Sequence, residues 1–513
     1  MTYLSGILIY LLILVAVGLY KVKSVKNSED FMVAGRSLPW YILVGTLLAT
    51  WMGSGSLFSG AGLGYRNGLA GLWSSGGAWL GIVFIYFITR RIRNFGKVTV
   101  PDIFDARYGR IAAILATITT VIAYITIVSY QFRGGGKVLY LVSDGIISLD
   151  NGIIITAIFA ISYTVIAGMF SVVYTDVVNG ILMAIGTIGA LVFLVLKIGG
   201  IEEIITIAEI PGKWQLFGNW SAERVGVISG PVIAISFFVP TMLLLMGDAN
   251  MYQRIFSAQD GGSAKKAVFF WIFGIIILES VICLLGLTGS VAVSKGILPD
   301  LVAREISNLS VVTPANILEA RQAGSESVIP AIARYAGLPT ILGLVLVSTM
   351  MAIIVSTADS FLLIPATNLT RDVYLRYVKP DADEKRILLV SRFLVLILGL
   401  VAFLLVSQFK TVLKAAYTAY NIYGASITPA LLATFLWKRA TSQGAIASII
   451  TGTTITIIWT FFLPNWSGYL KLHPLLQELT YPAAGLSIFA LVSVSLMTPA
   501  PKGELLEKFF NDN

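Results

Sequence analysis

Apolar runs of about 17 to 25 residues recur along the whole chain and constrain its fold more than any other feature. An α-helix needs about 20 apolar residues to cross a bilayer. The runs end at basic or turn-forming residues, and they lack the alternation that strands of a membrane barrel would show. Composition agrees, because 57% of the 513 residues are hydrophobic, 12% are charged, and the mean hydropathy is +0.85. The sequence therefore predicts an all-α integral membrane protein.

About thirteen runs are expected to span the membrane. They cover residues 3–21, 39–65, 69–89, 111–136, 151–168, 171–196, 226–252, 266–293, 340–367, 387–407, 411–436, 442–463 and 481–498. Basic residues follow the first run rather than precede it, which is the reverse of a cleaved signal peptide, so we expect a retained helix. The chain is expected to form one transmembrane domain over residues 1–513.

The distribution of basic residues predicts the orientation of the chain. Lysine and arginine gather in the loops after the odd-numbered runs, while the alternate loops are sparser. The positive-inside rule then places the N-terminus outside, residues 294–338 outside, and the C-terminus in the cytoplasm. Basic residues in cytoplasmic loops also account for the net charge of +9, so a nucleic-acid partner is not expected. We expect a multi-pass protein of the plasma (inner) membrane.

Two of the runs are interrupted by glycine, proline and polar residues. The second contains "WMGSGSLFSGAG" and the seventh contains "FFVPTMLLLMGDANMYQR". Backbone that opens at membrane depth survives only where it lines a cavity or binds something, and paired interruptions point to an inverted-repeat transporter. The spacing predicts two five-helix repeats over 39–196 and 226–436. One helix (3–21) precedes them and two (442–498) follow.

Polar groups lie inside the apolar run that contains "MAIIVSTADSFLLI". Ser356 and Asp359 share a helical face, and Thr357 flanks it. Basic residues are expected to be nearly absent at this depth, so an unpaired acid suggests a bound cation, a proton, or a protonated carboxyl. The alternative is that the hydroxyls bond back to their own helix and Asp359 is a protonated structural acid.

Three further acids lie within or at the ends of spans. Asp176 either binds a cation or caps a short turn, and Glu279 is compatible with a protonated carboxyl that bonds between helices. Asp248 lies in the second interruption. Tyr417 and Tyr420 stand at helical spacing, which is more often a feature of packed cores than of ligand sites.

Several motifs together are similar to those of the sodium/solute symporters, whose members carry proline, sugars, sialic acid, pantothenate, iodide or choline. They are "AGRSLPW", "ATWMGSGS", "AGMFSVVYTDVV", "MYQR" followed by "AKKA", and "VSTADSFLL" followed by "TRDVY". The resemblance covers nearly the whole chain. It implies a LeuT-like inverted repeat of 5+5 helices and import of a small organic solute with Na⁺ by alternating access. Na⁺ is then the coupling ion, and no organic cofactor is expected.

The resemblance also implies site residues. For Na⁺ it implies hydroxyl ligands and backbone carbonyls from Ala49, Met52, Ile353, Ser356 and Thr357. A second cation or coupling role is implied for Asp176, and Asp359 is a candidate for the same role. The solute positions are Trp51, Ser56, Asp248, Asn250, Tyr420 and Asn421. The motifs look nearest to the choline-carrying branch, where Trp51 would be an aromatic wall for a quaternary ammonium. An amino acid, a sugar or a carboxylate are the other solutes considered.

Other classes of function are less compatible with the sequence. A channel would need repeated filter segments such as "TVGYG", and none occurs in the chain. An enzyme is not expected, because the chain has a single histidine, His473, and no nucleotide loop or nucleophile elbow. Proton coupling in place of Na⁺ stays open, since Asp359 and Glu279 could titrate. A monomer in the bilayer would suffice.

Overall fold

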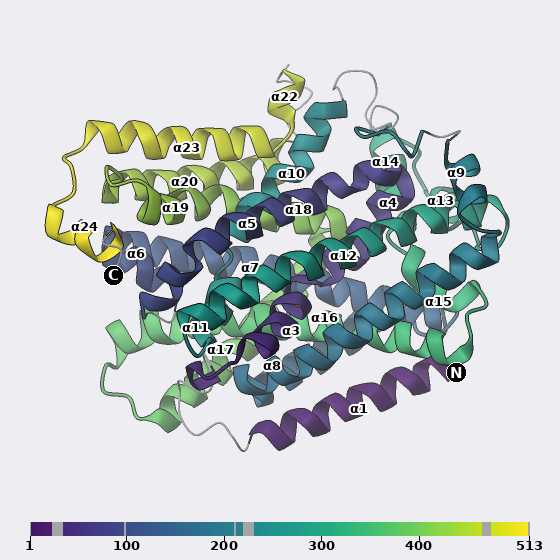
Figure 1. Ribbon diagram of the computed structural model, residues 1–513, viewed down its shortest axis with the longest axis horizontal. Coiled ribbons are helices and arrows are strands. Elements are labelled where there is room, and N and C mark those ends of the chain that lie inside the picture. The colour runs from purple at the N-terminus through teal and green to yellow at the C-terminus, as the bar shows by residue number, and fades with distance from the viewer. Residues whose placement is uncertain are drawn as a thin grey trace.

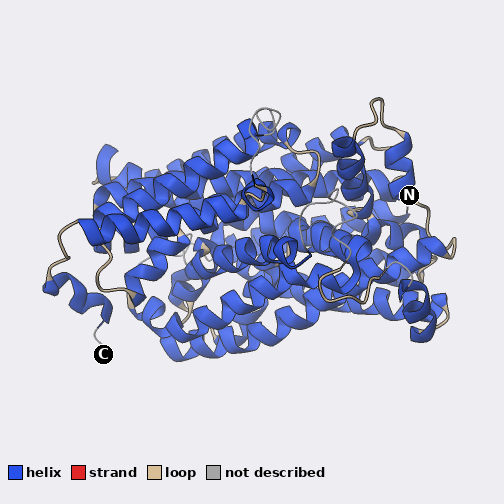
Figure 2. Cartoon of the chain, turned by 90° about the horizontal axis from the view of Figure 1, so that it is seen from above, coloured by secondary structure: helices blue, strands red, loops and turns tan. Residues whose placement is uncertain are grey.

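The computed structural model describes residues 2–22, 34–96, 99–209, 212–218, 230–463 and 473–510. Within these ranges the chain forms helices and no strand, which confirms the predicted all-α class (Figures 1 and 2). Ten helical segments there are long and apolar enough to cross a membrane, and two shorter apolar helices cover Thr2–Val17 and Trp40–Trp51. Lys23 and Lys26, which helped to orient the first span, lie outside the described residues.

The helices fall into two halves of the chain. The first half contains α1 (Thr2–Val22), α3 (Trp40–Trp51), α4 (Ala61–Asn67), α5 (Leu72–Asn94), α6 (Val100–Tyr108), α7 (Arg110–Val142), α8 (Leu149–Ile198) and α9 (Ile201–Glu209). The second half contains α10 (Gly230–Gly247), α11 (Ala249–Ser257), α12 (Gly261–Ser294), α13 (Leu301–Ser307), α14 (Pro314–Ser325), α15 (Val328–Tyr335), α16 (Thr340–Asn368), α17 (Glu384–Leu405), α18 (Val412–Ser426), α19 (Thr428–Leu436), α20 (Ser442–Ile457), α22 (Pro474–Gln477), α23 (Thr480–Met497) and α24 (Gly503–Phe510). In Figure 1, α1 lies along one edge against α8, and α20 and α23 lie along the opposite edge.

The two candidate spans within α8, Leu149–Ile166 and Val172–Ile198, run in opposite directions. Asp144, just before α8, pairs with Arg334 at 2.5 Å, and Lys197, near its end, donates to the Ala336 carbonyl at 2.5 Å. A straight helix of this length would separate its ends by roughly 75 Å. Both ends of α8 therefore lie at the same face of the protein, as two separate membrane crossings require.

Both predicted interruptions are present. The second span divides into α3, a π-helical segment η2 (Gly55–Gly60) and α4, and the seventh divides into α10 and α11 at Asp248. Pro240 lies inside α10 and does not end it. A third interruption, which the sequence analysis did not predict, separates α18 from α19 at Ile427. Its signal was available, because Pro429 stands in the first turn of α19, where proline is favoured.

Glycines allow close packing between the two halves. In each half, the helix that follows the interrupted span packs on the interrupted span of the other half. A Cβ at Gly77 of α5 would lie 2.0 Å from the Phe238 carbonyl oxygen of α10. A Cβ at Gly286 of α12 would lie 1.9 Å from the Ala61 carbonyl oxygen of α4. Small residues allow such close helix contact in membranes. The packing of α5 on α10 is thus mirrored by that of α12 on α4, as two inverted repeats would require.

The connections gather at two opposite faces. At one face Arg376 pairs with Asp102 at 2.7 Å, and the Leu38 amide bonds to the Ser257 carbonyl at 3.0 Å. At the other face lies the pair of Asp144 with Arg334, whose guanidinium lowers the pKa of the Asp144 carboxyl below its usual value. We call these the Asp102 face and the Asp144 face. The grouping agrees with the alternation of loops that the sequence predicted.

Candidate functional site

The interruption of the second span opens the backbone at Met52 and Gly53. Met52 has φ −78° and ψ 87°, outside the helical region, and the Gly53 amide bonds back to the Trp51 carbonyl at 3.0 Å. A Cβ at Gly53 would lie 2.9 Å from the Thr357 methyl carbon, so glycine allows α16 to approach the opened backbone. Carbonyls released from a helix at this depth are available to coordinate a cation.

Thr357 lies against the opened backbone, where its Oγ1 donates to the Met52 carbonyl at 3.4 Å. Ala49 stands one turn before Met52 on α3, and Ile353 stands one turn before Thr357 on α16. Both are fully buried. The structure thus brings Met52 and Thr357 of the predicted Na⁺ ligands together and places Ala49 and Ile353 beside them along their helices. Ser356, the fifth predicted ligand, bonds to a different group.

Ser356 donates its hydroxyl to the Asp176 carboxylate. Asp176 lies in the second span of α8 and is fully buried, and its hydrogen bonds go to side chains of other helices rather than to backbone amides of a turn. It also accepts hydrogen bonds from Thr46 Oγ1 at 2.6 Å and Thr50 Oγ1 at 3.4 Å. Asp176 therefore links α8 to both helices of the predicted ion site, α3 and α16.

The expectation that basic residues are nearly absent at this depth is wrong, because Arg254 is fully buried beside Asp176. Its Nη2 lies 3.3 Å from the Asp176 Oδ2 and donates to Ser360 Oγ at 2.7 Å. Its Nε donates to Thr46 Oγ1 at 3.0 Å. The sequence suggested a loop position, but α11 continues to Ser257 and carries Arg254 back into the protein. The carboxylate of Asp176 therefore has a buried cationic partner.

Asp359 lies one turn beyond Ser356 but contacts a different helix. Its Oδ1 accepts a hydrogen bond from Thr164 Oγ1 of α8 at 2.5 Å, and its Oδ2 is buried without a hydrogen-bond partner among the described residues. A buried carboxylate oxygen that lacks a partner is costly unless a proton or a cation satisfies it. Asp359 thus remains a candidate for ion coupling.

A small cavity adjoins the same interruption, and Thr357 does not line it. Its walls come from α3, η2, α5, α10, α12 and α18, and it is lined by Trp51, Gly55, Ser56, Ser59, Ser74, Ser75, Thr241, Glu279, Ala416, Tyr417 and Tyr420. Its volume is ≈ 20 Å³, room for about one water molecule. The rings of Trp51 and Tyr420 stack with their centroids 6.4 Å apart. Three predicted solute residues, Trp51, Ser56 and Tyr420, therefore share one cavity.

Glu279 projects from α12 to this cavity, a position that sequence reasoning did not assign to the solute site. Its two carboxylate oxygens accept hydrogen bonds from Trp51 Nε1 at 2.8 Å and Trp79 Nε1 at 2.9 Å. The contact with Trp51 joins residues far apart in the chain, so no local pattern could have revealed it. The available signal was a single acid in the middle of an apolar span.

Asp248 and Asn250, also predicted for the solute, bond instead within the junction of α10 and α11. Asp248 caps α11 by accepting from the Asn250 amide at 2.8 Å and from the Tyr124 hydroxyl. The Asn250 side-chain oxygen accepts from Arg254 Nη1 at 2.9 Å. These residues hold the second interruption in shape and position Arg254.

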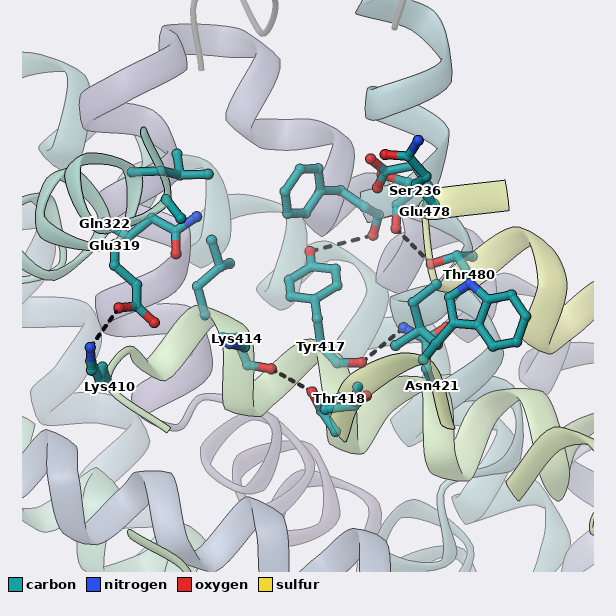
Figure 3. A pocket seen from close by; sticks show the side chains of 18 of the residues that line it. Ser236, Glu319, Gln322, Lys410, Lys414, Tyr417, Thr418, Asn421, Glu478 and Thr480 are labelled. Carbon is teal, nitrogen blue, oxygen red and sulfur yellow. Dashed lines mark hydrogen bonds and ion pairs between the residues drawn. The ribbon is translucent and has the colours of Figure 1, made fainter. Parts of the chain in front are cut away.

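A larger vestibule of ≈ 620 Å³ lies between the cavity and the Asp144 face. Figure 3 shows Tyr417 at its centre, with Asn421 one turn further along α18 and Lys410 paired with Glu319 at the edge. Tyr417 lines both spaces, and its hydroxyl donates to Ser74 Oγ at 2.5 Å. Asn421 lines only the vestibule and donates to the Tyr417 carbonyl at 2.8 Å. Tyr417 therefore separates the vestibule from the cavity.

The sequence is similar to one family over most of its length. The model of the sodium:solute symporter family matches residues 31–452. A sodium/glucose cotransporter of Vibrio parahaemolyticus is 27% identical over 522 residues, which cover 96% of this chain and 91% of the relative. A sodium/proline symporter of Escherichia coli is 25% identical over 514 residues, covering 98% of this chain and 94% of the relative.

The fold is also similar to those of solved transporters. The substrate-bound, outward-open structure of a Na⁺-coupled sialic acid symporter superposes with a TM-score of 0.77 at 18% identity and covers 98% of each chain. A closed structure of Mhp1, a nucleobase-cation-symport-1 family transporter, superposes with a TM-score of 0.53 at 12% identity and covers 94% of this chain and 99% of Mhp1. These similarities support the predicted inverted-repeat fold.

Proposed function

Because this chain belongs to the sodium:solute symporter family, we propose that its Na⁺ site lies between the interruption of α3 and the hydroxyls of α16. The observation that carries this proposal is the contact of Thr357 Oγ1 with the opened backbone at Met52. Hard oxygen ligands of this kind suit Na⁺ in transporters with discontinuous helices. Ala49, Ile353 and Ser356 complete the proposed set. Ser356 reaches it by exchanging its bond to Asp176 for a bond to the ion.

Import of a small organic solute fits the arrangement of the two spaces. The vestibule lies toward the Asp144 face, which the distribution of basic residues assigns to the outside. Solute would enter there, pass Tyr417, and bind against Trp51, Ser56 and Tyr420. Trp51 directly precedes the proposed carbonyl ligand Met52, Ser56 follows it four residues later, and the Tyr420 ring of α18 stacks on Trp51. Binding of ion and solute would therefore act on the same short segment, residues 51–56.

The remaining assignments follow from this reading. We assign the two repeats to 39–196 and 226–436, on the mirrored packing of α5 with α10 and of α12 with α4. The N-terminus would lie outside and the C-terminus inside the plasma membrane. Glucose and proline in the names of the relatives support a small organic solute, and a monomer contains both proposed sites.

Na⁺ binding to the purified protein tests the ion site without knowledge of the solute. We expect NaCl, but not KCl, to raise the thermal unfolding midpoint of the wild type. Ser356→Ala combined with Thr357→Ala removes two hydroxyl ligands and should raise the half-saturating Na⁺ concentration at least about tenfold, or about 1.4 kcal/mol. Thr349→Ala is the matched control on α16, because this buried hydroxyl has no hydrogen-bond partner among the described residues.

The identity of the coupling ion and the location of its site can be contradicted by different results. If NaCl stabilises the wild type no more than KCl, but a lower pH stabilises it, proton coupling is favoured instead. If Na⁺ stabilises the double variant and the wild type with equal half-saturation, the ion binds elsewhere and the site is misplaced.

A further inference from the structure

Glu279 lines a cavity and has no ion-pair partner among the described residues, whereas Asp248 and Asp359, which also lack one, line neither the small cavity nor the vestibule. Asp176 is paired with Arg254, and Glu326 is paired with Lys137 at 2.6 Å. Among the described residues, no lysine or arginine forms an ion pair with Glu279. Its hydrogen-bond partners are the indole N–H groups of Trp51 and Trp79 and the hydroxyls of Ser75 and Ser56, all of them uncharged. These uncharged donors orient the carboxylate but supply no positive charge to balance it.

The other walls of the cavity suit a positively charged group. Trp51 and Tyr420 stack against each other, and Tyr417 lies 5.5 Å from Tyr420 between ring centroids. Ring faces of tryptophan and tyrosine attract ammonium groups, and the attraction grows when water is excluded. The carboxylate and the aromatic faces are therefore complementary to the same kind of ligand. A neutral or anionic ligand would leave the Glu279 charge uncompensated in a buried site.

The cavity also offers a contact for a second, polar part of a ligand. The Ser59 hydroxyl is buried, lines the cavity, and has no hydrogen-bond partner among the described residues. A buried hydroxyl without a partner is uncommon and suggests that a ligand or water satisfies it. Ser59 projects from the π-helical segment η2, directly after the opened backbone of α3.

We propose that Glu279 is the specificity-determining contact of the solute site, and that the transported solute carries a positively charged nitrogen, either a quaternary ammonium or a protonated amine. This inference rests on the proposed symport function and adds the class of solute to it. The nitrogen lies between the Glu279 carboxylate and the rings of Trp51 and Tyr420. A hydroxyl or carboxylate elsewhere on the solute reaches Ser59.

Binding to the purified full-length protein in Na⁺ tests the charge requirement directly. Two matched pairs separate charge from shape: choline against its carbon isostere 3,3-dimethyl-1-butanol, and proline against cyclopentanecarboxylic acid. Glucose is the neutral solute of different shape. We expect at least one ammonium compound to raise the thermal unfolding midpoint, and its partner without the charged nitrogen to bind at least about tenfold more weakly.

Glu279→Gln keeps the shape and the hydrogen-bonding capacity of the side chain but removes its charge. We expect it to abolish the preference for the charged member of the pair while leaving stabilisation by Na⁺ alone intact. Glu279→Asp should retain part of the preference. Cys283→Ala, one turn along α12 and outside the cavity lining, is the control and should behave as the wild type does.

Each other result contradicts the inference in a distinct way. If the wild type binds only glucose or the compounds without charged nitrogen, or none of the ammonium compounds, the solute class is wrong. If Glu279→Gln lowers affinity equally for both members of a pair, Glu279 is structural. If it removes proton-coupled uptake of a neutral solute instead, Glu279 carries a proton. If Na⁺ alone does not stabilise the wild type, the proposed symport function itself is contradicted.

Discussion

Arg254 contributes to stability through a single buried ion pair. Its guanidinium has hydrogen-bond or ionic contacts with Asp176, Thr46, Ser360 and Asn250, and both charged side chains are fully buried. Arg254→Gln would leave the Asp176 charge uncompensated, and breaking such a pair typically costs about 3–5 kcal/mol. We expect a large fall in the thermal unfolding midpoint of the purified protein.

A double variant separates lost charge balance from lost packing. Asp176→Asn combined with Arg254→Gln removes both charges, so it should be more stable than Arg254→Gln alone. Arg386→Gln, at an exposed position of α17, is the control and should have little effect. Strictly additive losses in the double variant would show that the pairing of the two charges does not matter.

Asp359 gives a pH-dependent prediction at the same scale. A proton and Na⁺ would compete for its unpartnered Oδ2, so the half-saturating Na⁺ concentration should rise as the pH falls from 7.5 to 5.5. Asp359→Asn should remove most of this dependence and weaken Na⁺ binding, because the Thr164 bond survives but the charge does not. The nearby charged groups, Asp176 and Arg254, already satisfy each other. Equal pH dependence in both proteins, measured by Na⁺-dependent unfolding shifts, would identify Asp359 as a structural acid.

The role of a single residue could be predicted from the sequence only where its partners lie in the same segment of the chain. The hydroxyls of Ser356 and Thr357 were predictable, because an apolar helix with adjacent polar groups is visible in one segment. The burial of Arg254 was not, since its partners come from α3, α8 and α16. Glu279 was recognised as an isolated acid, but its indole partners come from α3 and α5.

Gly76 and Gly77 are adjacent in α5, but only Gly77 is needed for the close packing of α5 on α10. Gly77→Ala would place a Cβ 2.0 Å from the Phe238 carbonyl oxygen, so the helices must separate, at about 1–3 kcal/mol. Gly76→Ala would place a Cβ 3.5 Å from the Phe238 ring, an ordinary contact, and gains about 0.5–1 kcal/mol of helix propensity. We expect Gly77→Ala to lower the unfolding midpoint and Gly76→Ala to leave it unchanged or raise it. The opposite order would contradict the observed packing.

Elements were predictable where the chain carries strong local signals. The long apolar runs identified the spans, and glycine-rich or polar clusters identified the breaks before Ser54 and at Asp248. The break between α18 and α19 has only a proline signal at Pro429, within a run that is otherwise apolar. The π-helical segments, such as η2, have no counterpart in the apolar periodicity, because they depend on contacts with neighbouring helices.

Orientation of the whole molecule is testable with two cysteine variants. Val312 near the Asp144 face is 70% exposed and Val378 near the Asp102 face is 67% exposed, whereas the native Cys283 is buried. If the basic loops are cytoplasmic, an impermeant thiol reagent should label Val312→Cys in intact cells and Val378→Cys only after permeabilisation. The wild type measures background labelling. Labelling in the reverse order would invert the assignment of the faces.

The small volume of the cavity beside Trp51 has a consequence for the direction of net flux. A carrier that could reorient only when loaded would exchange solute across the membrane without accumulating it. Here the space closes to about the size of one water molecule, with Tyr417 bonded across its entrance. A space of this size holds no solute, and a carrier that closes its site in this way can change the face to which it opens without opening a leak for water or ions. With such a return step, a gradient of Na⁺ is converted into uphill accumulation rather than one-for-one exchange.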